Sequence, residues 1–123
     1  MTARGGTPGL TTGIRLSGDL NSASVGIMQE ALDRIAKSLD GYVAGNTTKS
    51  VATIELVSAF KVVCRKGHID PDQLQDDIQA FIDGVLIRLN GGLSTQAEAQ
   101  AELARVYEAA HGGNPDMKAL LNA

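Results

Sequence analysis

The sequence contains few aromatic residues and only one cysteine. Its 123 residues include no Trp, and Tyr and Phe together make up 3% of the chain. A buried core must therefore be built from Leu, Ile, Val and Ala side chains. The shortage of aromatic rings also argues against the stacking platforms with which many proteins bind single-stranded nucleic acid.

The single cysteine, Cys64, cannot form a disulfide within the chain. We also find no signal-peptide pattern and no apolar run long enough to cross a membrane. These features lead us to expect a cytoplasmic protein in a reducing environment. Cys64 lies on the apolar side of a predicted helix, where we expect a small buried hydrophobe. A nucleophile would need a nearby base and positive surroundings.

The net charge of −3 is too small to direct the whole molecule towards nucleic acid or an anionic membrane. Its distribution is uneven. Residues 1–68 hold eight Lys and Arg against five acids, whereas residues 69–123 hold three against nine. This asymmetry fits either ordinary scatter between helix faces or a dipolar subunit whose oppositely charged regions attract each other in an assembly. We expect no nucleic-acid partner and no membrane partner.

Residues 50–66 are a long run without a turn residue, which predicts a single helix. At about 100° per residue, one broad face of this helix is apolar. That face comprises Ala52, Leu56, Val57, Ala59, Phe60, Val63 and Cys64. Val51, Ile54 and Val62 fall among polar residues on the opposite side. A helix that is apolar nearly all round needs cover on more than one side. We therefore predict the central helix of a helical domain, or one completed by a second subunit.

The remaining patterns complete an all-α prediction: a small four-helix domain with a short C-terminal helix. An amphipathic helix is predicted from about residue 22 to 44, and another from Asp70-Pro71 to about residue 90. A fourth helix opens with a capping box of Thr95 and Glu98, and a short last helix ends near residue 121. We assign residues 22–123 to one helical domain, in which short connections make successive helices antiparallel neighbours.

Residues 1–21 are rich in Gly and Thr and lack helical periodicity, so we predict a flexible or extended N-terminal arm. Within the arm, Ile14 and Leu16 alternate with polar neighbours, and Leu20 follows. Two interpretations stay open. The arm is a loose terminus, or these aliphatic residues pack against a neighbouring subunit as an added strand or as pegs.

No motif predicts catalysis, a cofactor or a metal. The glycines before Lys49-Ser50 suggest a phosphate-binding loop, but the chain has no glycine directly before the lysine. The acids of residues 70–77 lack the alternating ligands and the closing Glu of a calcium loop. His68 and His111 do not show the spacing of metal ligands. We expect no catalytic, cofactor-binding or metal-binding residue.

The expected function is that of a non-enzymatic helical interaction or assembly subunit, which forms a homo-oligomer through apolar surface that its own fold leaves uncovered. The predicted interface consists of Ile14, Leu16 and Leu20 in the arm and Val51, Ile54 and Val62 in the central helix. The alternative is a small regulatory protein, such as an inhibitor, an immunity protein or a chaperone-like protein, that binds a different chain. An enzyme or a ligand-binding bundle is the third interpretation.

Overall fold

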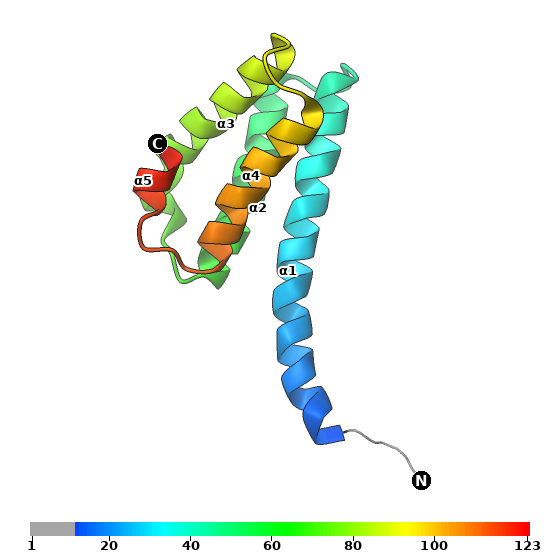
Figure 1. Ribbon diagram of the computed structural model, residues 1–123, viewed down its shortest axis with the longest axis vertical. Helices are drawn as coiled ribbons and strands as arrows, with labels where there is room; N and C mark the ends of the chain where they lie inside the picture. The colour runs from blue at the N-terminus through cyan, green and yellow to red at the C-terminus, as the bar shows by residue number, and fades with distance from the viewer. Residues whose placement is uncertain (1–11) are drawn as a thin grey trace.

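The computed structural model describes the backbone of residues 12–123 and the side chains of residues 26–123. Over the described backbone the chain is helical and contains no strand. Its elements are α1 (Thr12–Val43), α2 (Lys49–Lys66), the 3-10 helix η1 (Pro71–Leu74), α3 (Gln75–Asn90), α4 (Gln96–His111) and α5 (Met117–Leu121). The predicted all-α fold, with four long helices and a short C-terminal one, is confirmed. Figure 1 shows successive long helices running in opposite directions along one bundle.

Helix α2 packs against all three other long helices, α1, α3 and α4, and α4 likewise packs against the other three. All seven residues of its predicted apolar face are buried. The ring of Phe60 meets Tyr107 of α4 edge to face, with the ring centroids 5.3 Å apart. The Tyr107 hydroxyl donates a hydrogen bond to the backbone carbonyl of Leu56. The buried side of α2 thus joins helices that are far apart in the chain.

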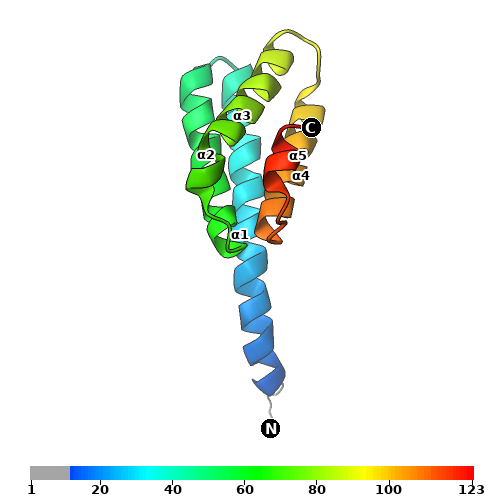
Figure 2. The ribbon, with the colours of Figure 1, turned by 90° about the vertical axis from the view of Figure 1, so that its left-hand side faces the viewer.

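Helix α1 begins at Thr12, earlier than the predicted start near residue 22. The backbone of residues 12–21 is therefore helical, which differs from the extended arm that we expected. Figures 1 and 2 show this part of α1 continuing beyond the end of the bundle. Extending an existing helix is much easier than nucleating one, so the packed part of α1 can propagate into a stretch without helical periodicity. Residues 1–11 lie outside the described residues.

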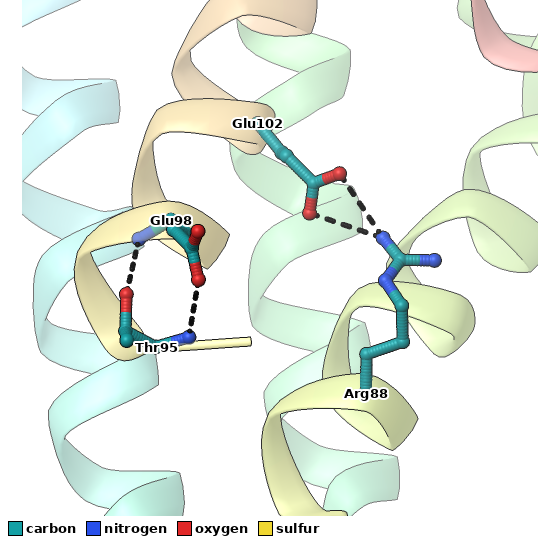
Figure 3. A network of polar contacts seen from close by, with 4 residues as sticks. All are labelled: Arg88, Thr95, Glu98 and Glu102. Atoms are coloured by element: carbon teal, nitrogen blue, oxygen red, sulfur yellow. Dashed lines mark hydrogen bonds and ion pairs between the residues drawn. The ribbon is translucent and has the colours of Figure 1, made fainter. Parts of the chain in front are cut away.

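Threonine side chains begin α2 and α4. The hydroxyl of Thr48 accepts the backbone N–H of Val51 at 3.2 Å. At α4, the Thr95 hydroxyl accepts the N–H of Glu98 at 3.1 Å, and the Glu98 carboxylate accepts the N–H of Thr95 at 2.8 Å (Figure 3). The predicted capping box is confirmed. The third helix differs slightly from its prediction, because Pro71 opens a 3-10 turn and α3 follows at Gln75.

The four long helices share one type of C-terminus. Each is followed by a residue in the left-handed conformation, namely Gly45, His68, Gly92 and Gly113. The N–H of that residue donates to the carbonyl three positions earlier, and the next N–H donates to the carbonyl five positions earlier. This pairing is the Schellman motif, in which glycine is favoured because it has no Cβ. His68 is the exception, with φ 60°.

Helices α2 and α4 approach each other very closely at Gly67. A Cβ added there would lie 1.9 Å from the carbonyl oxygen of Ala110 and 2.9 Å from the backbone nitrogen of Gly113. Gly67 itself has φ −83°, which any residue can adopt. Glycine is therefore required at this position by the contact between the two backbones and not by backbone conformation.

Replacing Gly67 with alanine tests this contact. We expect Gly67→Ala to lower the free energy of unfolding by about 2–3 kcal/mol, because a methyl group has no room beside a backbone carbonyl. Gly112→Ala is the matched control, since Gly112 also follows a helix with φ −80° and its added Cβ would meet nothing nearer than 3.5 Å. That variant should change stability by less than about 1 kcal/mol. Urea unfolding measures both, and equal losses would contradict the assignment.

Candidate protein-interaction surface

The outward side of α2 carries apolar residues that the fold leaves uncovered. Val51 is 45% exposed, Ile54 65% and Val62 46%. Together with the exposed Ser58, they lie within about 80° of one another around the helix axis. We call Val51, Ile54, Ser58 and Val62 the α2 stripe. At 1.5 Å per residue the stripe is about 17 Å long.

Shallow grooves run along both sides of the stripe near Ile54. On one side α2 faces α3, and the ammonium of Lys49 lies 2.5 Å from the carboxylate of Asp83. On the other side α2 faces α1, and the hydroxyl of Ser38 donates to Glu55 at 2.9 Å. The stripe is therefore a low apolar ridge between two grooves. Polar contacts in these grooves join α2 to α3 on one side and to α1 on the other.

At the C-terminal end of α2 the stripe continues onto α1. Val62 and Ala59 border a small depression together with Ile27 and Ala31, and the ion pair of Glu30 and Arg34 lines it as well. Ile27 is partly buried against the core. In Figures 1 and 2, α1 continues past this end of the bundle. The apolar surface thus extends to the place where α1 loses contact with the other helices.

The structure brings together the three predicted interface residues of the central helix. The side chains of the other three, Ile14, Leu16 and Leu20, lie outside the residues whose side chains are described. Three more large apolar residues are exposed outside the stripe and were not predicted as interface residues: Val43, Ile87 and Leu93. None belongs to a periodic exposed pattern, and single exposed apolar residues are ordinary on protein surfaces.

A bifurcated contact from one guanidinium nitrogen joins α3 and α4 on another face. The guanidinium of Arg88 donates to both carboxylate oxygens of Glu102, at 3.0 and 3.2 Å (Figure 3). Nearer the C-terminus, Asp77 accepts from Asn122 and pairs with Lys118, each at 3.1 Å. These hydrogen bonds lower the pKa of the Asp77 carboxyl. Such contacts on exposed helix faces fix neighbouring helices and contribute little energy each.

The reactive residue types are used structurally. Cys64 is fully buried, and burial raises the pKa of its thiol to about 12. Burial also raises the pKa of Tyr107, whose hydroxyl is bound to a backbone carbonyl. His68 occupies the left-handed position after α2. Among the described residues, no group of three or more His, Cys, Asp or Glu is arranged to hold a metal ion. Nor does any described helix have the length and apolarity to cross a membrane.

The buried thiol predicts that Cys64 is inert in the folded protein. At pH 8 its thiolate form should be scarce because its pKa is about 12, and its sulfur has no access to solvent. Ellman's reagent should therefore label one thiol per chain in urea and almost none in the native state. Rapid labelling under native conditions would show that α2 opens easily, which would contradict its packing against three other helices.

Comparison with known proteins places this chain in no family. No family model, curated protein or solved structure matches it.

Proposed function

We propose that this chain is a non-enzymatic assembly subunit that forms a homo-oligomer in the cytoplasm by burying the α2 stripe and the N-terminal segment. The observation that supports this proposal is the stripe itself. Val51, Ile54 and Val62 are aliphatic, lie along one line of an ordered helix, and are each about half exposed or more. A partner that covers them removes the exposed parts of three aliphatic side chains from water.

The stripe alone is too small to hold two chains together. Covering the exposed parts of three aliphatic side chains is worth about 2–5 kcal/mol. Association costs about 4–15 kcal/mol in lost translational and rotational freedom. A stable oligomer therefore needs additional surface. For this reason the proposal includes the N-terminal segment with Ile14, Leu16 and Leu20.

The N-terminal part of α1 is suited to this role. It continues beyond the bundle without a neighbouring helix from its own chain (Figure 1). A helix of this length is marginal in water when it has no tertiary contact. Contact with another subunit would stabilise the segment and would supply the surface that the stripe lacks.

The α2 stripe is tested by placing a charge at its centre. We expect Ile54→Asp to weaken self-association at least tenfold, measured by light scattering over a range of protein concentrations. Since Ile54 is 65% exposed, the free energy of unfolding should change by less than about 1 kcal/mol. Leu93→Asp is the control, because Leu93 is 79% exposed and lies outside the stripe. A wild-type chain that is monomeric at all concentrations would contradict the proposal and favour a regulator of a different protein.

The N-terminal segment is tested by removing residues 1–17. The truncated chain keeps the packed part of α1, so its circular dichroism and urea midpoint should stay close to those of the full chain. We expect its self-association to fall, because the truncation removes Ile14 and Leu16. Unchanged association would exclude the segment from the interface.

A further inference from the structure

The end of the bundle from which α1 projects carries both signs of charge. Three cations and three anions lie there. They come from the last turns of α2, from the connection that follows it and from the first turn of α3. The cations are Lys61, Arg65 and Lys66, and the anions are Asp70, Asp72 and Asp76. We call these the basic patch and the acidic patch. Among the described residues, none of the six forms a salt bridge.

Neighbouring patches of opposite charge are complementary to a second copy of themselves. When two identical surfaces meet about a two-fold axis, a region of one copy that contacts a second region of the other copy receives the same contact in return. The basic patch of each copy can then face the acidic patch of its partner, and the contact occurs twice. Like-charged patches would repel each other in the same arrangement, so the charge pattern favours a two-fold contact at this end.

Such an end-to-end contact determines where the projecting part of α1 goes. Because α1 continues past this end of the bundle, it would run along the body of the other copy (Figures 1 and 2). Residues 12–25 span about 20 Å as an α-helix, which is close to the length of about 17 Å for the α2 stripe. The stripe also starts at this end, where Val62 adjoins Ile27.

The composition of residues 12–25 fits an apolar partner. This stretch contains Ile14, Leu16, Leu20 and Val25, and its only charged residues are Arg15 and Asp19. At about 100° per residue, Ile14 and Val25 share one side of the helix, and Leu16 and Leu20 share the opposite side. Its net charge is zero, so it would place no uncompensated charge against the stripe. The match in length and in position, together with one pair of aliphatic residues on the side that would face the stripe, joins the two surfaces that were predicted separately.

We propose that the occupant of the α2 stripe is the α1 extension of a second copy. Two chains meet through their charged ends about a two-fold axis, and residues 12–25 of each lie along the α2 stripe of the other. This inference rests on the proposed self-association and adds its geometry: a dimer with reciprocal exchange of N-terminal helices.

Disulfide cross-linking between two singly substituted chains tests the exchange. One full-length chain has Ser22→Cys in the extension, and the other has Ser58→Cys in the stripe, because the two positions lie at similar distances, about 5 and 6 Å, from the end at which the copies meet. Serine to cysteine is a small change, and the buried Cys64 should not compete for oxidation. We expect mild oxidation of the mixture to link most of the chains that have paired as mixed dimers. Ala101→Cys replaces the stripe variant in the control mixture, since Ala101 is exposed on α4 and should link at least tenfold less.

The outcomes separate this geometry from self-association in general. Linked dimers in the first mixture, with few in either single variant alone, support the exchange. Efficient linking of Ser22→Cys chains to each other would show that the extensions pair together, and would overturn it. Association in light scattering without any cross-link would leave the proposed function standing and overturn the geometry. A monomer in light scattering would overturn both.

Charge reversal tests the contact at the bundle end with the same cross-link. Arg65→Glu should lower the yield of linked dimers severalfold at low salt, because it places an anion opposite the acidic patch. Adding Asp72→Lys to the same chain should restore most of the yield, since residues 65 and 72 have then exchanged signs and each again faces an opposite charge. If the second substitution lowers the yield further, the two-fold contact between the charged ends is wrong.

Discussion

The structure depends on the burial of one helix from three sides. Helix α2 is apolar around most of its circumference, and α1, α3 and α4 cover the larger part of it. Three neighbours do not surround a helix completely. The side of α2 that faces away from them is the side on which Val51, Ile54 and Val62 remain exposed. The candidate surface therefore exists because α1, α3 and α4 cannot cover every side of a helix that is apolar nearly all round.

At the C-terminal end of α2, close packing between two backbones fixes the distance between α2 and α4. Gly67 allows the backbone of α2 to meet that of α4 at Ala110, while Phe60 and Tyr107 fill the space further along. The polar contacts between helices lie around the margins of this core and are partly exposed, as between Lys49 and Asp83. Contacts of that kind fix orientation more than they add stability. The energy that holds the bundle together comes mainly from buried aliphatic side chains.

The same end of the bundle concentrates the features that argue for association. There the α2 stripe reaches α1, α1 leaves the other helices, and the basic and acidic patches follow one another along the chain. Each feature alone is common on a protein surface. Their occurrence at one end is the reason to propose one contact that uses all of them, and a second copy is the partner whose charges match by symmetry.

The sequence determined the features that depend on nearby residues. Threonine and glutamate three positions apart specified the start of α4, and helical periodicity identified the buried face of α2 and the three aliphatic residues opposite it. Only the tertiary structure decided why residue 67 must be glycine and which side of α2 stays uncovered. Capping and periodicity act within about one turn of helix. The contact of Gly67 with Ala110, and the cover that leaves Ile54 exposed, arise between segments that only folding brings together.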